Sequence, residues 1–100
     1  MTGDQKTKTG QMKYRMRLFV ADNEPNSAAA KENIRKICDN HLGTTDCELY
    51  IIDVFEDYSQ ALTENILITP ALVIDAPHHN VIFGNLHDIK KVIQTLGLYD

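Results

Sequence analysis

The sequence is most informative at Leu67-Ile68-Thr69-Pro70-Ala71-Leu72-Val73, where a Thr-Pro pair interrupts an apolar run. The residues after the proline are apolar and include a β-branched valine, which favours a strand that begins near Ala71. A peptide bond that precedes proline can adopt the cis form at tolerable cost, and a cis bond usually lies in a tight turn. We therefore expect a cis Thr69–Pro70 bond in a turn that leads into this strand.

The residues before this turn alternate between strand and helix patterns. Apolar side chains at every second position predict a first strand over residues 14–20, and helical spacing of apolar side chains follows it. Asn23 or Asn26 can cap that helix, with Pro25 in the cap or the first turn. An almost continuous apolar run over residues 48–55 then predicts a second strand, parallel to the first and covered by helices on both faces.

The remaining pattern completes the predicted order of elements. A short helix is expected within residues 58–66, before the Thr-Pro turn. Residues 71–75 and 80–83 are short strands joined closely enough to form an antiparallel hairpin. Apolar positions on one helical face predict a last helix over residues 86–96. The predicted fold is therefore α/β with the order βαβαββα, a mixed four-stranded sheet with three helices.

Length and composition limit the chain to one small domain. One hundred residues with 43% hydrophobic content allow a single core, which we place in residues 14–100 behind a disordered polar tail over residues 1–13. The formal net charge of −4 argues against nucleic acid as a partner. No apolar run is long enough to span a membrane, and the first residues lack the apolar region of a signal peptide. We expect a cytoplasmic protein.

Cys38 and Cys47 are the two cysteines of the chain, and both lie inside apolar patterns. Their spacing matches neither a redox pair nor a zinc knuckle. We expect both to be buried structural thiols that behave as small hydrophobic side chains. A disulfide between them is not expected, because the cytoplasm is reducing.

None of the catalytic or metal-binding patterns is convincing. The element order and the Thr-Pro turn resemble the thioredoxin fold, whose redox members carry a Cys-x-x-Cys motif after the first strand. This chain has Asp22-Asn23-Glu24-Pro25-Asn26-Ser27 there, so a redox function is the least favoured alternative. Ser27 fits a helix cap better than a nucleophile, and the histidines within residues 78–87 fit solvated loops better than a metal site. We expect no cofactor, no metal and no enzyme activity.

Four segments resemble the KaiB family of bacterial circadian-clock proteins, and the similarity runs from about residue 17 to about residue 98. The most specific segment is Leu18-Phe19-Val20-Ala21-Asp22-Asn23-Glu24-Pro25-Asn26-Ser27, which is similar to the family's LYVAGNTPNS segment. The others are Ile52-Asp53-Val54, Ile68-Thr69-Pro70-Ala71-Leu72 and Gly84-Asn85-Leu86. The sensory domain of the SasA histidine kinases is a similar thioredoxin-like domain.

The resemblance implies a thioredoxin-like, non-enzymatic protein that docks on KaiC, a ring-forming ATPase, and helps to sequester KaiA. It also implies two folds, a tetrameric ground state and a monomer that binds KaiC, so self-association to a dimer or tetramer is one expectation. The motif residues that the resemblance implies for partner binding are Asn23, Pro25, Asn26, Ser27, Asp53, Thr69, Pro70, Gly84 and Leu86.

This chain departs from the clock members of the family at several positions. Asp22 replaces a glycine, Ala29 and Ile74 replace basic residues, and Pro77-His78-His79-Asn80 replaces a Pro-Pro-Pro-Val-Arg-Arg segment. Those basic side chains help the clock members to bind KaiC. Two functions therefore stay open: docking on a KaiC-like ATPase, or action without KaiC in another signalling or stress pathway. Thr95 replaces a glycine that favours the ground state, which tilts the balance toward the thioredoxin-like form.

Overall fold

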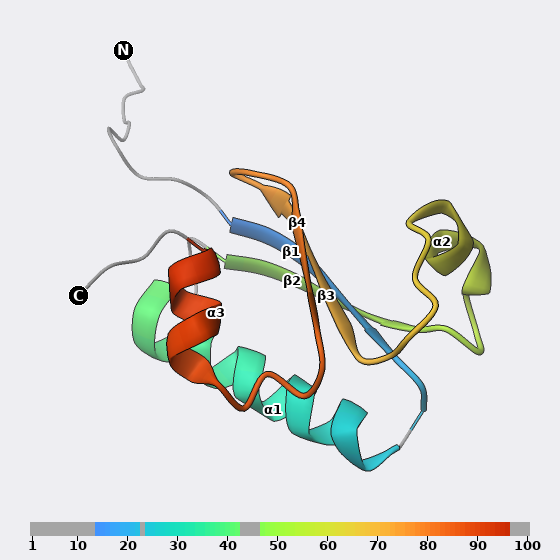
Figure 1. Cartoon of the computed structure of the whole chain (residues 1–100), viewed down its shortest axis with the longest axis horizontal. Coiled ribbons are helices and arrows are strands. Elements are labelled where there is room, and N and C mark those ends of the chain that lie inside the picture. Colours follow the sequence, from blue (N-terminus) through green and yellow to red (C-terminus); the bar gives the residue numbers. More distant parts are fainter. Residues whose placement is uncertain (1–13, 23, 43–46, 97–100) are drawn as a thin grey trace.

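The computed structural model describes residues 14–22, 24–42 and 47–96 (Figure 1). The predicted tail over residues 1–13 and the candidate residue Asn23 lie outside the described residues. The elements are β1 (Tyr14–Val20), α1 (Pro25–Ile37), the π-helical turn η2 (Cys38–Leu42), β2 (Cys47–Asp53), α2 (Tyr58–Thr63), β3 (Ala71–Ala76), β4 (Asn80–Phe83) and α3 (Ile89–Thr95).

The four strands form one mixed sheet in the order β2-β1-β3-β4. β1 and β2 are parallel, whereas β3 is antiparallel to both β1 and β4. Leu18 of β1 lies opposite Ile51 of β2 and Leu72 of β3. The predicted βαβαββα order, the parallel pair and the hairpin are confirmed.

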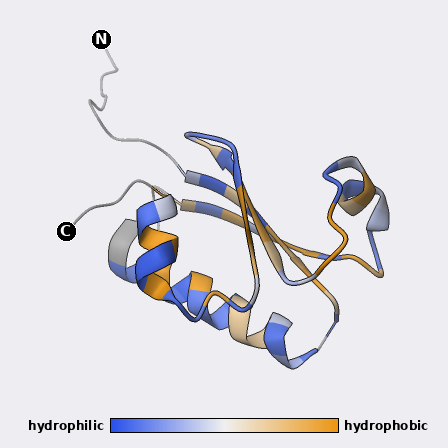
Figure 2. Cartoon of the chain, in the orientation of Figure 1, coloured by the Kyte–Doolittle hydropathy of each residue, from blue (hydrophilic) through white to orange (hydrophobic). Residues whose placement is uncertain are grey.

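The helices cover the two faces of the sheet unequally. α1 and α3 pack on one face, here called the α1 face, and α2 lies at one end of the opposite α2 face (Figure 1). Hydrophobic residues recur along α1 and α3 between hydrophilic ones (Figure 2). Met16, Leu18, Ile34, Leu72 and Val92 are among the fully buried side chains of the α1 face. Burying one such side chain contributes about 1.5–3 kcal/mol, so this face carries most of the stabilisation.

A smaller apolar cluster lies on the α2 face. Phe19 of β1 is fully buried there, and Ala61 of α2 and Ile66 pack against it. Ala71 and Val73 of β3 complete the cluster. α2 is therefore anchored through the small side chain of Ala61 and through the loop that follows the helix.

β2 differs from the predicted strand with helices on both faces. It is an edge strand of the sheet, and the Tyr50 side chain is 53% exposed. The prediction that helices cover both faces was wrong, because an apolar run reports the polarity of side chains and not which elements pack over them; Tyr50 and Ile51 are both exposed. β1 uses its other edge to pair with β3, which leaves β2 with a single strand neighbour.

The start of α1 also differs in detail from the prediction. Pro25 is the first residue of the helix, as expected, but the cap is Glu24 rather than Asn26. The Glu24 Oε1 atom accepts a 2.9 Å hydrogen bond from the backbone N–H of Ser27. Because proline favours the first helical position, the residue before it becomes the cap, and Asn26 then lies inside the first turn.

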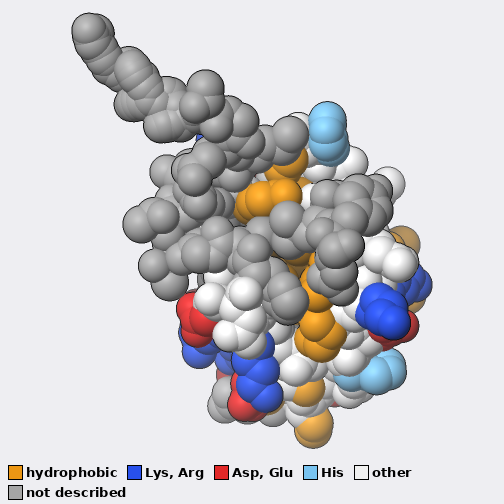
Figure 3. Space-filling view, turned by 90° about the vertical axis from the view of Figure 1, so that its left-hand side faces the viewer, with side chains coloured by type: hydrophobic (Ala, Val, Ile, Leu, Met, Phe, Trp, Pro, Cys, Tyr) orange, Lys and Arg blue, Asp and Glu red, His pale blue; other side chains and the backbone are white. Residues whose placement is uncertain are grey.

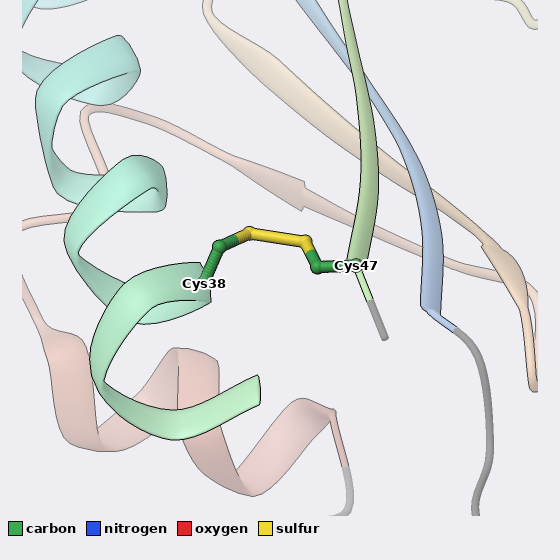
Figure 4. The surroundings of a disulfide bond; sticks show 2 residues. All are labelled: Cys38 and Cys47. Carbon is green, nitrogen blue, oxygen red and sulfur yellow. A yellow bond between two sulfur atoms is a disulfide. The ribbon is translucent and has the colours of Figure 1, made fainter. Parts of the chain in front are cut away.

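The two cysteines form a disulfide, contrary to the expectation of free thiols (Figure 4). Cys38 lies in η2 and Cys47 begins β2, and their Cα atoms are 6.1 Å apart, within the range that a disulfide requires. Cys38 is buried as predicted, whereas Cys47 is partly exposed. The expectation rested on the reducing cytoplasm, and that reasoning contains no information on the distance between the two cysteines. In the structure, the helical turn η2 that extends α1 places Cys38 beside the start of β2.

Candidate functional site

The strand directions bring the described motif residues to one edge of the sheet. β1 and the parallel β2 end there, the antiparallel β3 begins there, and β4 ends there. α1 also begins at this edge (Figure 1). We call this region the motif edge, and its residues are Pro25, Asn26, Ser27, Asp53, Thr69, Pro70, Gly84 and Leu86.

Ser27 organises the turn between β1 and α1. Its side chain is fully buried, and its Oγ atom accepts a 3.1 Å hydrogen bond from the backbone N–H of Ala21. The backbone of Asp22 takes a left-handed conformation in this turn, with φ of 51°. Pro25 and Asn26 are exposed beside it, so the first turn of α1 is presented to solvent.

The entry of β3 and the exit of β4 are joined directly. The Thr69–Pro70 bond is cis, as predicted, and the carbonyl oxygen of Pro70 accepts a 2.9 Å hydrogen bond from the backbone N–H of Gly84. Gly84 has a φ of +106°, a conformation that L-residues rarely adopt. Leu86 follows with φ of 65°, and its side chain is buried in the core of the α1 face.

Asn85 connects the β4 exit to α1, although sequence analysis did not place it among the site residues. Its carbonyl oxygen accepts a 2.9 Å hydrogen bond from Nδ2 of Asn33, and its own Nδ2 lies 3.5 Å from Oδ1 of Asn26. A pocket of about 240 Å³ lies beside it, lined by residues 82–88 together with Lys91 and Val92. The signal for Asn85 was available, because it lies between two motif residues.

Asp53 shapes the turn that leaves β2. Its Oδ1 atom accepts a 2.9 Å hydrogen bond from the backbone N–H of Phe55, and its carbonyl oxygen accepts hydrogen bonds from Glu56 and Asp57. The next residue, Val54, donates a hydrogen bond to the carbonyl oxygen of Val20. Asp53 therefore stabilises this turn through its own contacts, and its use by a partner stays a prediction.

A polar cluster that we call the Arg17 clamp holds α2 against the sheet. The Arg17 guanidinium forms two 2.8 Å hydrogen bonds with Asp75, and one of 2.6 Å with Glu64. Gln60 accepts a fourth, of 3.3 Å. The hydrogen bonds that Arg17 donates to Asp75 raise the pKa of Arg17 above its ordinary value, so Arg17 remains charged. Sequence analysis missed this cluster, because its members come from β1, α2 and β3.

Exposed apolar side chains gather next to the motif edge. Eight large hydrophobic side chains are exposed in the described residues, and five of them lie between residues 55 and 68. They are Phe55, Tyr58, Leu62, Leu67 and Ile68, with exposed fractions from 65% to 86%. Periodicity predicted the helix but not its exposure, because the apolar spacing of α2 resembles that of a helix that packs on a core.

The described residues provide little for redox or metal chemistry. Cys47 lies at the opposite end of β2 from Asp53, so the disulfide is remote from the motif edge. Within residues 14–22, 24–42 and 47–96, no three His, Cys, Asp or Glu side chains converge as a metal site would require. His79 instead lies 3.7 Å from a carboxylate oxygen of Glu64. None of the helices in these ranges is long and apolar enough to cross a membrane.

Comparisons with known proteins agree on a family and a fold. Residues 17–98 match the family model of the KaiB domain. The circadian clock protein KaiB3 of Synechocystis sp. is 36% identical over 84 residues, which cover 83% of this chain and 79% of that protein. A circadian clock oscillator protein KaiB of Prochlorococcus marinus is 37% identical over 86 residues, which cover 85% of this chain and 81% of the length of that protein.

Solved structures show the same fold at lower identity. The N-terminal domain of Synechococcus elongatus SasA superposes with a TM-score of 0.71 and 23% identity, over 96% of this chain and 94% of that domain. Thioredoxin 1 of Thermosipho africanus superposes with a TM-score of 0.66 and 24% identity, over 83% of this chain and 90% of the thioredoxin chain. The thioredoxin-like architecture expected from the sequence is confirmed.

Proposed function

We propose, from the premise that this chain belongs to the KaiB family of circadian clock proteins, that it is a non-enzymatic binding module that docks on a KaiC-like ATPase. One observation carries this proposal: the described motif residues, distant in sequence, lie together at the motif edge. Hydrogen bonds from Gly84 to Pro70 and from Ala21 to Ser27 hold that edge in place. A preformed edge loses little conformational entropy when a partner binds.

The position of the cysteines supports a binding function over a redox function. A thioredoxin-type nucleophile lies at the start of the first helix, where the helix dipole lowers the thiol pKa. The first turn of α1 contains Pro25, Asn26 and Ser27 instead, and the disulfide lies at the far end of the sheet. We infer that the protein works as a binding partner and not as an oxidoreductase.

A second candidate function is a KaiB-like role in another signalling or stress pathway, without KaiC. One observation favours it: Ala29 and Ile74 stand where clock members have basic side chains, and Ile74 is buried. No Lys or Arg lies between Lys36 and Lys90 in the sequence. An acidic ATPase surface would therefore find little charge attraction on this part of the chain.

The test of the first candidate is a binding titration between the purified protein and the KaiC-like ATPase of the same genome. Asn26→Trp places a bulky uncharged side chain on the exposed first turn of α1 at the motif edge. Asn40→Trp is the matched control, because Asn40 is also exposed but lies in η2, beyond the other end of α1. We expect Asn26→Trp to weaken binding by roughly tenfold through steric clash, a typical effect of a central interface residue.

The outcomes separate the two candidates. Binding by the unmodified protein and by Asn40→Trp, with weak binding by Asn26→Trp, supports docking through the motif edge. Equal weakening by both variants would contradict the motif edge as the docking site. If neither the unmodified protein nor Asn40→Trp binds the ATPase, the second candidate replaces the first.

A further inference from the structure

The segment that carries α2 combines exposed apolar side chains with acidic ones. We define the α2 surface as Phe55, Glu56, Asp57, Tyr58, Leu62, Leu67 and Ile68. Monomeric proteins rarely gather large exposed apolar side chains in one place, and such a gathering usually marks an interaction site. Leu67 is 86% exposed and Phe55 is 74% exposed, which are the two highest values among the large hydrophobic side chains described.

The geometry of α2 explains why these side chains point outward. Ala61 and Ile66 anchor the segment to the sheet, whereas Tyr58 and Leu62, four residues apart and neighbours on α2, are 66% and 65% exposed. The Arg17 clamp fixes α2 through Glu64 and Gln60. The α2 surface is thus preformed, and a partner does not have to order it.

The charges of this segment have one sign. Asp53, Glu56, Asp57 and Glu64 are acidic, and the nearest Lys or Arg in the sequence are Lys36 and Lys90. Glu64 is neutralised by Arg17, whereas Glu56 and Asp57 form no ion pair within the described part of the chain. The hydrogen bonds from Gln60 and Ser59 lower the pKa of Asp57, which keeps it ionised at neutral pH. The opposite end of the molecule differs, since Lys and Arg lie beside Asp and Glu there (Figure 3).

We propose that the α2 surface binds a cationic amphipathic segment of a partner protein, with its apolar side chains on Tyr58, Leu62 and Leu67 and its Lys or Arg beside Glu56 and Asp57. Charge complementarity selects this occupant, because anionic lipid headgroups and nucleic acid phosphates would be repelled by the same carboxylates. The inference rests on the proposed role as a binding module. It holds whether the partner is the KaiC-like ATPase or another protein.

The test uses a defined probe, a labelled amphipathic helical peptide of roughly 14 residues made of Leu and Lys, which spans about four turns. NMR spectra of the ¹⁵N-labelled protein locate the bound peptide, and fluorescence anisotropy measures its affinity. We expect shift changes centred on residues 55–68 and affinity that falls steeply between about 50 mM and 500 mM salt. The same peptide with Glu in place of Lys is expected to show no binding.

Two variants on the α2 surface and one matched control complete the experiment. Glu56→Lys and Leu62→Ser are each expected to weaken peptide binding by about fivefold or more, since each removes one component of the proposed contact. Glu32→Lys makes the same charge change at an exposed position of α1 and is expected to bind as the unmodified protein does. Glu56, Leu62 and Glu32 are all exposed, and exposed positions tolerate such changes without unfolding.

Several results would overturn the inference. These are shift changes spread over the α1 face, equal weakening by Glu56→Lys and Glu32→Lys, or light scattering that finds the unmodified protein dimeric and Leu62→Ser monomeric, which would mean that a second copy of the chain covers the α2 surface. The ATPase titration tests the proposed function, and its result is interpreted separately from peptide binding. If Glu56→Lys and Leu62→Ser leave ATPase and peptide binding unchanged, the inference fails while the proposed function stands. If the peptide binds at residues 55–68 but the ATPase does not bind, the inference stands and the KaiC proposal fails.

Discussion

The α1 face and the α2 face of the sheet are stabilised in different ways. On the α1 face, two helices cover a continuous apolar core that includes Leu18, Ile34 and Val92. On the α2 face, one helix of six residues is held by a small apolar cluster and by the directional hydrogen bonds of Arg17. Apolar burial is non-directional and insensitive to pH, whereas charged hydrogen bonds depend on geometry and ionisation.

This difference indicates that the two faces have different roles. The α1 face supplies global stability, and the α2 face presents the exposed apolar and acidic side chains beside the motif edge. Short elements with few buried contacts open at a lower free energy than the core does. α2 should therefore respond to small changes that leave the α1 face intact, and four predictions test this from the largest expected effect to the smallest.

The largest effect is expected from a cavity in the α1 face. Ile34→Ala removes a fully buried side chain and should lower the free energy of unfolding by about 2–5 kcal/mol. Leu62→Ala on α2 is the control, because Leu62 is 65% exposed and its truncation should cost less than about 0.5 kcal/mol. Urea unfolding followed by circular dichroism measures both, and equal losses would contradict the proposed difference between the faces.

The disulfide should give the next largest effect. It closes a loop with a sequence separation of 9, for which chain entropy predicts a stabilisation of about 2–3 kcal/mol. A reductant should lower the free energy of unfolding of the unmodified protein by this amount and leave the Cys38→Ser, Cys47→Ser double variant unaffected. Unfolding curves with and without reductant measure the loss. Alkylation of both cysteines in the native, unreduced protein would show that the bond is not formed.

Removal of the Arg17 clamp should have a smaller and more local effect. Arg17→Met leaves the carboxylates of Glu64 and Asp75 without their shared cation, which should cost about 1–2 kcal/mol at this partly buried position. Hydrogen exchange should speed up in residues 58–63 and stay unchanged in α1. Arg15→Met on the same strand is the control, because Arg15 is 55% exposed. Uniform acceleration over the whole chain would contradict a local clamp.

The smallest effect is expected from acid. The pKa of Asp57 is lowered by hydrogen bonds from Gln60 and Ser59, so ionised Asp57 favours the folded α2 turn. This contribution is present above the unfolded pKa of about 4 and is lost as pH falls through the lower folded value. An NMR titration of the α2 amides should show the change, and Asp57→Asn should abolish it while Glu56→Gln keeps it. An identical acid response in Asp57→Asn would refute this role.

Several parts of the structure followed from local patterns in the sequence. The alternation over Tyr14–Val20 predicted β1, and Thr69–Pro70 predicted a cis bond before β3. Short quoted segments also pointed to the KaiB family, to which residues 17–98 match. These features depend on neighbours in the chain, so side-chain period and proline chemistry are sufficient to predict them.

Other parts were missed or wrong, and each depends on distant residues. The edge position of β2 depends on which strand takes the other side of β1. The clamp joins Arg17 to Asp75, 58 residues later. The exposure of Leu62 depends on whether anything covers α2, and the helical period of the sequence is the same in either case.

The sequence by itself determined the order of elements, the Thr-Pro turn and the family, because these reside in local spacing and in contiguous motifs. Only the tertiary structure decided that the motif residues share one edge, that Cys38 meets Cys47, and that an acidic apolar surface lies beside that edge. The physical reason is that strand direction and strand pairing place residues in space, and pairing is settled by the packing of the whole chain.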